Sequence, residues 1–353
     1  MGTKIDRREF LKKGIGSIAT VAAISSPVSE LLGQEESIKP VRIGVIGTGA
    51  RGRDLMKMLF SMPKIEMPAL CDINEAHLNL GKEIVKKFKG ITPDGYSKGP
   101  YDYRRMLERD DLDGVLIATP IEWHGVMSID AMKAGKHVGC EVPGEYDLDE
   151  LWELVKTKEE TGMHYTILEN YIYPRERMMV YNMLNQGIFG EPYYAECCYI
   201  GDLKYMAFNS DGTLTWRGKL GVDNYGNYYP THAIGPVAKW LGINDGDRME
   251  YCVSMMTKPR VLHQYAVKHF GPDSDAAKIK FKMGEFTSTL IYTAKGKVIR
   301  VDFDVLSPRP DTHYYLVQGE KGIYDSRSGI YIDDGSKRWS SANKYLPQYD
   351  HPC

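Results

Sequence analysis

The feature that most constrains this chain is a glycine-rich turn that joins two apolar runs within residues 41–72. Residues 41–46 are apolar and rich in β-branched side chains, which predicts a buried strand. The turn leads into a predicted helix near residues 54–61, and a second predicted strand covers residues 65–71. This order of strand, glycine turn, helix and strand is typical of the start of a doubly wound α/β fold.

Three glycines of the turn, Gly47, Gly49 and Gly52, form the pattern G-x-G-x-x-G. They suit a tight turn, a close approach of the backbone to a pyrophosphate, and close packing of a helix on a strand. The phosphates would lie at the helix N-terminus, where N–H groups point outward without partners. Asp72 ends the second strand, where its carboxylate can accept a hydrogen bond from a ribose 2′-hydroxyl and would repel a 2′-phosphate. The segment therefore predicts an NAD site rather than an NADP site.

Strands and helices continue to alternate up to about residue 170, which predicts a parallel sheet with helices on both faces. The further helices are expected at residues 75–89, 103–109, 126–134 and 148–161, and the further strands at 113–120, 137–143 and 165–170. Ligands on such sheets bind beyond the carboxyl ends of the strands. The residues expected along the cofactor site are Gly47, Gly49, Ala50, Arg51, Gly52, Asp72, Glu122, Trp123, His124, Glu141, Val142 and Asn170.

After a helix expected at residues 175–185, the pattern changes to short strand-like runs separated by glycine or proline clusters. These runs lie at residues 194–199, 250–256, 286–293, 298–305 and 314–318, and they predict a mostly antiparallel sheet. An irregular aromatic stretch at residues 216–232 precedes a helix expected at 233–241, and a glycine–proline loop is expected at 90–100. The domains predicted are an NAD-binding domain at 41–170 and an α+β substrate domain at 171–353.

Composition narrows the class of protein. The chain has 353 residues and a formal charge of −2, which permits two domains and argues against nucleic acid as the main partner. The six cysteines form no metal-ligand pattern and no disulfide framework, so we expect no metal, and Cys71 and Cys140 are expected to be buried thiols. A small-molecule or glycan substrate is expected, and a homo-oligomer remains open.

The first 40 residues are predicted to be a targeting segment rather than part of the fold. Arg7 and Arg8 precede Phe-Leu-Lys, and a mild apolar stretch follows that is too short for a membrane span. This set resembles a twin-arginine export signal, followed by a linker. It predicts export by the machinery that recognises paired arginines and a periplasmic location; a basic tail is the alternative.

Glu141-Val142-Pro143 brings a first resemblance into view. The domain resembles the glucose–fructose oxidoreductase, inositol dehydrogenase and rhizopine-catabolism superfamily, whose members typically carry Glu-Lys-Pro at this place. In the ordinary dehydrogenases of that superfamily the lysine assists hydride transfer. Because Val142 replaces that lysine, the resemblance argues against plain dehydrogenase activity for this chain.

Further motifs resemble glycoside hydrolase family 109, the NAD-dependent α-N-acetylgalactosaminidases. They are Gly-x-Gly-x-Arg-Gly at 47–52, Glu-Trp-His at 122–124, Glu-Val-Pro-Gly at 141–144, Leu-Glu-Asn at 168–170, Trp-Arg at 216–217, Tyr-Pro-Thr-His at 229–232 and Gly-Pro-Val-Ala-x-Trp at 235–240. The likeness runs from about Val41 to the C-terminus. Two departures stand out: the chain ends soon after a Tyr-x-His-Pro segment that members usually continue past, and Asp311 replaces a substrate-binding tyrosine.

The resemblance implies a redox-neutral route to hydrolysis with retention. A tightly bound, recycled NAD oxidises the sugar 3-hydroxyl, a base removes the proton on carbon 2, the aglycone leaves, water adds, and the hydride returns. His232 suits the proton of the 3-hydroxyl, since histidine titrates near ~6.5, and Tyr229 and Tyr173 are candidates for the carbon-2 proton or for orienting the ring. The substrate residues expected are Tyr199, Arg217, Tyr229, Pro230, Thr231, His232 and Asp311.

Several of these residues also have plainer interpretations. His232 and His124 can each cap the helix that follows, Trp123 can fill a core, Arg217 can form a surface salt bridge, and Asn170 can support a turn. Two other classes of function stay open: a periplasmic NAD(P)-dependent sugar oxidoreductase, and an inactive sugar-binding relative.

Overall fold

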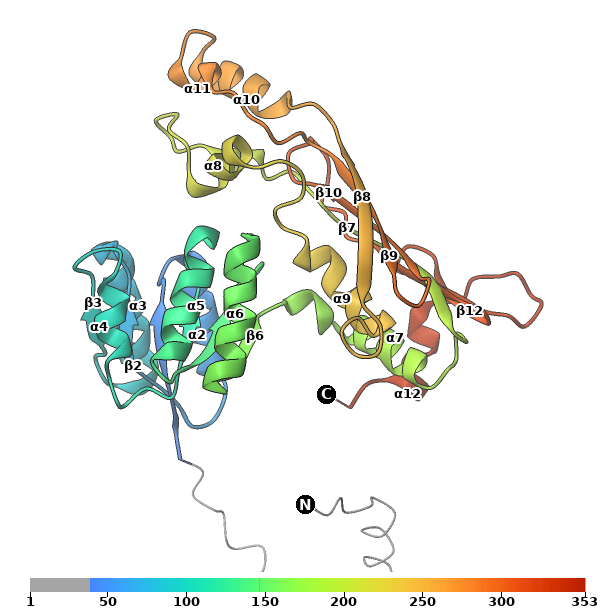
Figure 1. Ribbon diagram of the computed structural model, residues 1–353, viewed down its shortest axis with the longest axis horizontal. Coiled ribbons are helices and arrows are strands. Elements are labelled where there is room, and N and C mark those ends of the chain that lie inside the picture. The colour runs from blue at the N-terminus through green and yellow to red at the C-terminus, as the bar shows by residue number, and fades with distance from the viewer. Residues whose placement is uncertain (1–38, 146, 353) are drawn as a thin grey trace, which may run out of the picture. The chain divides into compact units, whose positions relative to one another are not determined.

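The computed structural model describes residues 39–145 and 147–352, so the paired arginines of the predicted export signal lie outside the described residues. From Val41 onward the chain forms one compact unit that contains two sheets. The six-stranded sheet uses the first half of that unit, and the seven-stranded sheet uses the second half (Figure 1). The predicted fold class, a doubly wound parallel sheet followed by a mostly antiparallel one, is confirmed.

The first sheet is parallel throughout and has the order β3-β2-β1-β4-β5-β6. The reversal of direction at β1 places the carboxyl ends of β1 and β4 side by side, which is where such sheets bind ligands. Its strands are β1 (Val41–Ile46), β2 (Ile65–Cys71), β3 (Asp94–Tyr96), β4 (Gly114–Ile117), β5 (His137–Cys140) and β6 (Tyr165–Ile167).

Both faces of this sheet are covered, because successive strand residues point to opposite sides. Val45 belongs to the apolar cluster under α2 (Ala50–Leu59) and α3 (Glu75–Lys89). Its neighbour Ile46 belongs to the cluster under α4 (Asp102–Leu107), α5 (His124–Lys133) and α6 (Leu148–Thr161). This near-continuous burial explains why the strands read as apolar runs rather than alternating ones.

Local sequence signals set the ends of the longer helices. Asn74 accepts hydrogen bonds from two backbone N–H groups at the start of α3, and Asp147 does the same for α6. Gly90 and Gly162 end these helices in the left-handed conformation that glycine adopts without strain. Both helices have the predicted bounds.

Three predictions in this half need correction. The helix after the glycine turn begins at Ala50 rather than near residue 54, so Arg51 and Gly52 lie in its first turn. The loop expected at residues 90–100 contains strand β3, which is only three residues long and pairs with β2. The strands expected to reach residues 120, 143 and 170 end at Ile117, Cys140 and Ile167, because Pro120, Pro143 and the 3₁₀ turn at residues 170–172 do not continue the ladder.

The second sheet has the order β13-β12-β11-β7-β10-β9-β8 and is antiparallel except between β7 and β10. Its strands are β7 (Pro192–Ile200), β8 (Met249–Met256), β9 (Thr287–Thr293), β10 (Val298–Asp304), β11 (Tyr315–Gly319), β12 (Gly322–Asp325) and β13 (Gly329–Ile332). Helices α7 (Arg175–Asn185) and α9 (Thr231–Leu241) pack on one face, and their apolar residues join those of β7, β10 and β11 in a single core.

The remaining elements lie between or after the strands of this sheet. The stretch expected to be irregular at residues 216–232 contains helix α8 (Trp216–Asp223), which Thr215 caps, and α10 (Val261–Phe270) was not expected at all. The others are α11 (Asp275–Lys278), α12 (Leu346–Tyr349) and the short 3₁₀ turns η1 (Ile121–Trp123), η2 (Asn170–Ile172), η3 (Lys204–Ala207) and η4 (Ala342–Lys344).

Candidate active site

The turn between β1 and α2 has the shape of a phosphate cradle. Gly47 has φ +91°, and an added Cβ would lie 2.7 Å from the carbonyl group of Ala118. A Cβ at Gly52 would lie 2.0 Å from the Gly47 carbonyl oxygen, so the close contact of α2 with the turn requires glycine. A Cβ at Gly49, in contrast, would meet nothing within 4 Å. Gly49 therefore faces open space at the start of α2.

The N-terminus of α2 suits an anion. Gly49 is its N-cap, no side chain caps it, and its first turn contains no acidic residue. Uncapped N–H groups and the helix dipole favour a phosphate at such a place. The open space above Gly49 and these N–H groups fit the pyrophosphate of a dinucleotide.

Asp72 is held next to this turn. Its Oδ2 accepts hydrogen bonds from the Thr48 backbone N–H at 2.8 Å and the Thr48 hydroxyl at 3.2 Å, and its Oδ1 accepts from the Asn74 N–H at 2.8 Å. These bonds fix the carboxylate beside the cradle. A carboxylate oxygen can accept more than one hydrogen bond, so Asp72 retains capacity for a ribose hydroxyl.

Two of the predicted cofactor residues pair with one another. The Arg51 guanidinium Nε donates to Glu141 Oε1 at 2.6 Å, and Glu141 is buried at the end of β5. Val142, which follows it, is also buried. The Glu141 carboxylate also acts on the Tyr229 hydroxyl, since it adds to the rise that burial causes in the pKa of Tyr229. This links the end of the first sheet electrostatically with the residues before α9.

The residues after β4 have a more structural character. His124 begins α5, is fully buried, and has its Nε2 2.8 Å from the Thr119 carbonyl oxygen, which can only accept. Its Nδ1 has no partner among the described residues, and burial lowers the pKa of His124. Trp123 packs against the core and meets the Tyr101 ring edge-on at 5.5 Å, whereas Glu122 is exposed.

The best-defined polar group of the second half is a histidine–carboxylate pair. His232 lies in the first turn of α9, and its Nδ1 is 2.9 Å and 3.0 Å from the two carboxylate oxygens of Glu169. Both side chains are nearly buried, with His232 8% and Glu169 6% exposed. Glu169 also accepts from the Tyr171 N–H at 2.8 Å, and the Tyr315 hydroxyl donates to the His232 carbonyl at 2.5 Å. The carboxylate holds the proton on Nδ1 and leaves Nε2 as an acceptor.

Aromatic rings surround this histidine. The rings of Tyr171, Tyr199 and Tyr229 lie with centroids 4.4, 4.9 and 5.0 Å from that of His232. Burial raises the pKa of Tyr171 and Tyr229, and it raises the pKa of Tyr199 to about 12. Their hydroxyls therefore stay protonated at neutral pH. We call these four residues together with Glu169 the His232 cluster.

A cavity of about 210 Å³, here called the inner cavity, adjoins the cluster. Its lining includes Tyr199, Trp216, Arg217, Tyr228, Tyr229 and Leu306. The Arg217 guanidinium lies over the ring of Trp216 at 4.0 Å, and it forms no ion pair within residues 39–145 and 147–352. The Thr231 hydroxyl is buried without a hydrogen-bond partner in the same part of the chain, next to His232, and Pro230 is the N-cap of α9. Polar groups that lack hydrogen-bond partners in the protein thus accompany aromatic ones here, as in small-molecule sites.

Comparisons with known proteins identify the family. The family described as "Glycosyl hydrolase 109, C-terminal domain" matches residues 173–353, and "Oxidoreductase family, NAD-binding Rossmann fold" matches residues 41–168. An α-N-acetylgalactosaminidase of Shewanella oneidensis is 34% identical over 99% of this chain and 81% of its own length. A glycosyl hydrolase family 109 protein of Solibacter usitatus is 36% identical, with the same coverage. The chain belongs to glycoside hydrolase family 109.

Solved structures extend the likeness of this family 109 protein at the level of the fold. An NAD-binding oxidoreductase from Klebsiella pneumoniae superposes with a TM-score of 0.65 at 18% identity, covering 84% of this chain and 77% of that one. A myo-inositol 2-dehydrogenase from Lactobacillus plantarum superposes with a TM-score of 0.63 at 17% identity, covering 88% of this chain and 86% of that one. The expected superfamily is confirmed, and NAD is the cofactor that the matching Rossmann family binds.

The structure does not gather all the predicted site residues of this family 109 protein. Tyr173 is 69% exposed, and no ring of the described residues stacks on it. Asn170 is exposed at the start of η2. Asp311 is exposed, but its Oδ1 approaches Gly201 closely enough that an added Cβ there would lie 2.4 Å from it.

Three residues at the site were missed in the sequence. Glu169 stands inside the Leu-Glu-Asn motif, two residues after the end of β6, which is a signal that points to it. Tyr171 is two residues further along, and His313 meets the rings of Tyr171 and Tyr199 at 5.1 and 4.9 Å. Burial lowers the pKa of His313, and the carboxylate of Asp311 opposes this.

Three further features of the described residues concern metal ligands, thiols and membrane spans. No group of three or more His, Cys, Asp or Glu side chains is placed to hold a metal ion within residues 39–145 and 147–352. Cys71 and Cys140 are buried thiols, as predicted, and burial raises the pKa of each to about 12. In the same part of the chain, no helix is both long and apolar enough to cross a membrane.

Proposed function

We propose that this chain hydrolyses N-acetylgalactosaminides, or glycosides of closely related sugars, with retention and without net oxidation. The observation that carries this proposal is the buried His232–Glu169 pair, which lies beside tyrosines in a chain that also contains an NAD cradle. The name of the Shewanella oneidensis relative supplies the sugar. The route would be transient oxidation at carbon 3, elimination across carbons 1 and 2, addition of water and re-reduction. It would use both the NAD cradle and the His232–Glu169 pair.

The cofactor would be held by the first sheet. The turn from Gly47 to Gly52 would receive the pyrophosphate on the open N-terminus of α2, and Asp72 would accept from the adenosine ribose. A bound NAD would supply a hydride acceptor at the start of the cycle and return that hydride at the end. Because this cycle is redox-neutral, the enzyme gains by retaining the cofactor tightly. Hydride transfer still needs a group that accepts the hydroxyl proton, and His232 would take this role in a chain that has Val142 in place of the lysine.

His232 would act as the base for the 3-hydroxyl. Its Nε2 is left unprotonated because Nδ1 is held by Glu169, and it can accept a proton when the carbon–hydrogen bond at carbon 3 breaks. The charge that then develops on the imidazole would be stabilised by the Glu169 carboxylate at 2.9 Å. The same histidine would return this proton when the ketone is reduced.

The tyrosines of the His232 cluster would donate hydrogen bonds rather than remove protons. Their hydroxyls are costly to ionise in this buried setting, as the pKa of about 12 for Tyr199 indicates. Tyr229 and Tyr171 lie nearer to His232 than the exposed Tyr173, so they are better placed to orient the sugar ring or to donate to its carbonyl oxygen. The base for carbon 2 would then be a water molecule, because His232 holds the proton of the 3-hydroxyl until the ketone is reduced.

Arg217 and the Thr231 hydroxyl would bind the substituents of the sugar. Within the described residues the Arg217 guanidinium forms no ion pair or hydrogen bond and the Thr231 hydroxyl forms no hydrogen bond, and Arg217 lines the inner cavity. Asp311 lies close enough to His313 and Tyr199 to affect the pKa of both. An acceptor at this place would suit a sugar hydroxyl that donates a hydrogen bond.

A hydrolysis assay with a cofactor measurement tests the proposal. Purified protein should release p-nitrophenol from p-nitrophenyl N-acetyl-α-galactosaminide, while absorbance shows bound nicotinamide but no accumulation of NADH. Steady production of NADH from free sugars would instead support the oxidoreductase alternative. Sugar binding with neither reaction would support an inactive relative.

We also propose that the chain is exported to the periplasm in folded form through Arg7 and Arg8. The paired arginines and the apolar stretch after them support this, and loading of NAD before export would suit it. The double variant Arg7→Lys, Arg8→Lys should keep the protein in the cytoplasm. Equal amounts of wild type and variant in the periplasm would contradict this.

A further inference from the structure

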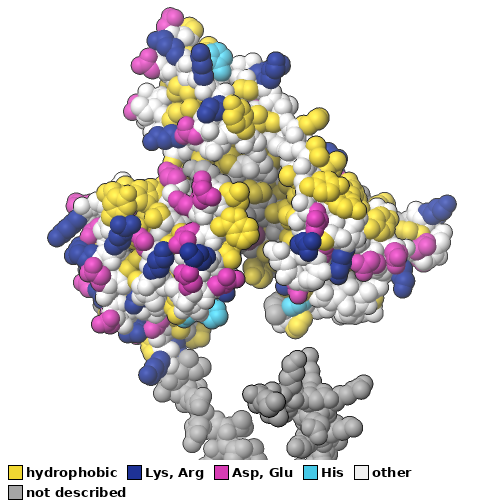
Figure 2. Space-filling model, viewed as in Figure 1, with side chains coloured by type: hydrophobic (Ala, Val, Ile, Leu, Met, Phe, Trp, Pro, Cys, Tyr) yellow, Lys and Arg dark blue, Asp and Glu magenta, His cyan; other side chains and the backbone are white. Residues whose placement is uncertain are grey.

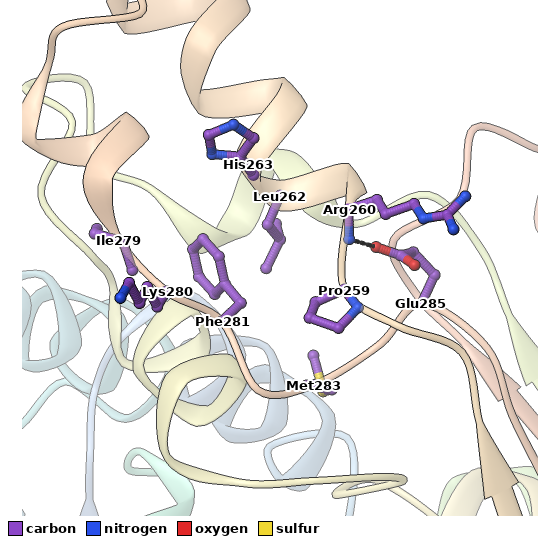
Figure 3. A pocket seen from close by; sticks show the side chains of 9 residues that line it. All are labelled: Pro259, Arg260, Leu262, His263, Ile279, Lys280, Phe281, Met283 and Glu285. Atoms are coloured by element: carbon purple, nitrogen blue, oxygen red, sulfur yellow. Dashed lines mark hydrogen bonds between the residues drawn. The ribbon is translucent and has the colours of Figure 1, made fainter.

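A second cavity, here called the outer cavity, lies between α10 and the segment at residues 279–285 (Figure 3). Its volume is about 340 Å³, within the ~300–1,000 Å³ of small-molecule sites. Leu262 and Phe281 point into the cavity, Lys280 lies beside Ile279 at one end, and the Arg260 side chain extends outward at the other end. It combines an apolar floor with cationic ends.

The outer cavity continues the inner cavity. Leu262 and Met283 line both, so the two cavities share these side chains as a wall. The backbone N–H groups of Lys282 and Met283 donate to the Gly221 carbonyl oxygen at 2.9 and 3.1 Å, which ties this wall to α8. Because Tyr199 and Tyr229 connect His232 with the inner cavity, the outer cavity lies one step further from the reacting sugar.

The charges around the outer cavity are not balanced by its one carboxylate. Glu285 Oε1 accepts from the backbone N–H groups of Arg260 and Val261 at 2.5 and 2.6 Å, so this carboxylate caps α10. Arg260 and Lys280 are exposed, and within the described residues neither forms an ion pair. The His263 Nδ1 lies 3.0 Å from the Ala277 carbonyl oxygen, so it donates and leaves Nε2 toward solvent or ligand.

The whole segment that forms the outer cavity is basic. Residues 257–285 contain six lysines and arginines and three acidic residues, although the chain as a whole has a formal charge of −2. Lys and Arg side chains lie over α10 and α11 in Figure 2. A local excess of positive charge next to a cavity attracts anionic ligands.

We propose that the outer cavity is a subsite for an anionic group, a sulfate or a carboxylate, on the aglycone of the substrate. The proposal rests on the glycosidase function proposed above. The terminal sugar would occupy the inner cavity and the His232 cluster, and the next sugar would pass over Leu262 and Met283. Lys280 and Arg260 would bind its charge, and Phe281 would cover its ring face. The preferred substrates are then acidic glycans rather than neutral ones.

Three matched disaccharides test this. Each carries N-acetylgalactosamine at the non-reducing end, linked to galactose, to galacturonic acid or to galactose 6-sulfate. Binding is measured by calorimetry on the His232→Ala protein, which holds the ligands without turning them over, and again with Arg260→Ala and Lys280→Ala added. Lys258→Ala is the matched control, because Lys258 is an exposed lysine of the same segment that does not line the cavity.

Both anionic disaccharides should bind at least ~10-fold more tightly than the neutral one, as one charge-assisted hydrogen bond allows. This preference should shrink with added salt and fall to about onefold in the double substitution, while Lys258→Ala keeps it. A preference for only one of the two anions would identify the source of the charge as sulfate or carboxylate. Equal binding of all three, or a preference that survives the double substitution, would overturn the proposal.

The hydrolysis of the same compounds by the wild-type protein separates the two proposals. Turnover of the neutral disaccharide without any anionic preference in binding would leave the glycosidase function intact and remove the subsite. Anionic preference in binding without turnover of any of the three would keep the subsite and remove the glycosidase function.

Discussion

The NAD cradle and the His232 cluster differ in how they are assembled from the chain. The cradle comes from one continuous segment, in which β1, the turn, α2 and β2 follow one another up to Asp72. The cluster draws on segments around Glu169, Tyr199 and His232, separated by more than two dozen residues each. A contiguous site depends on backbone shape, which glycine controls, whereas an assembled one depends on individual side chains. Substitutions should therefore act differently in the two regions.

The largest effect is expected for His232→Ala. Removal of the base should lower kcat by ~10²–10⁴-fold while bound NAD remains, because His232 lies outside the cradle. Turnover and nicotinamide content of the purified variant are the measurements. Loss of the cofactor together with activity would show that the two regions are not independent.

Glu169→Gln should have the next effect. The amide can still accept from Nδ1 of His232, but it carries no charge to stabilise a protonated imidazole, so kcat should fall by about 10²-fold. The pH dependence of kcat should shift as well, because the histidine loses its carboxylate partner at 2.9 Å. A merely structural role for Glu169 would lower stability and leave the pH profile unchanged.

In the cradle, two glycine substitutions should separate binding from folding. Gly49→Ala has room for its Cβ in the protein, so the thermal stability without NAD should stay near that of the wild type, while affinity for NAD should fall by ~10–100-fold. Gly52→Ala should instead destabilise the fold by ~1–3 kcal/mol, because its Cβ meets the Gly47 carbonyl oxygen. Calorimetric unfolding and NAD titration distinguish these outcomes, and normal NAD binding by Gly49→Ala would contradict the cradle.

Asp72→Ala should lower the affinity for NAD by about 10-fold, because one hydrogen bond to a charged group is lost. It should also relax the discrimination against NADP. The Thr48 N–H also loses its acceptor, so stability must be measured in parallel. Unchanged selectivity between NAD and NADP would show that Asp72 does not bind the adenosine ribose.

The smallest effect concerns the pH dependence of stability at His124. Burial lowers the pKa of His124, so below the ordinary histidine value of ~6.5 the unfolded chain binds a proton that the folded chain does not. Its contribution to stability is thus present above that pH and is lost as the pH falls toward the lowered pKa, by at most ~1.4 kcal/mol per pH unit. His124→Gln should remove this slope, and His269→Gln, at an exposed histidine, should keep it.

The sequence predicted the NAD cradle better than the His232 cluster, because the cradle comes from one continuous segment and the cluster does not. The bounds of β1, β2, α3 and α6 follow from local apolar runs, caps and glycines, so they could be read directly. Helix α10 could not, because a short amphipathic stretch gains stability from packing that the sequence does not display. Strand β3 was missed because three residues carry too little pattern.

The site itself shows the same limit. His232 was found through its motif, but the role of Glu169 depends on a partner 63 positions later in the chain. Tyr171 and Tyr173 both follow β6, and only the turn η2 decides which ring meets His232, because residues two apart on a 3₁₀ turn point in different directions. Orientation at the end of a strand is set by tertiary contacts, so Tyr173 was predicted from the sequence, whereas the structure places Tyr171 beside His232.

The most direct test of the central claim follows the hydrogen on carbon 2. Hydrolysis of an N-acetylgalactosaminide in deuterated water should place deuterium on carbon 2 of the released sugar, and a 3-deoxy substrate should be inert because it has no hydroxyl for His232 to deprotonate. Mass spectrometry and NMR of the product measure both. Product without deuterium at carbon 2, or hydrolysis of the 3-deoxy glycoside, would contradict the redox–elimination route and require a pair of catalytic carboxylates instead.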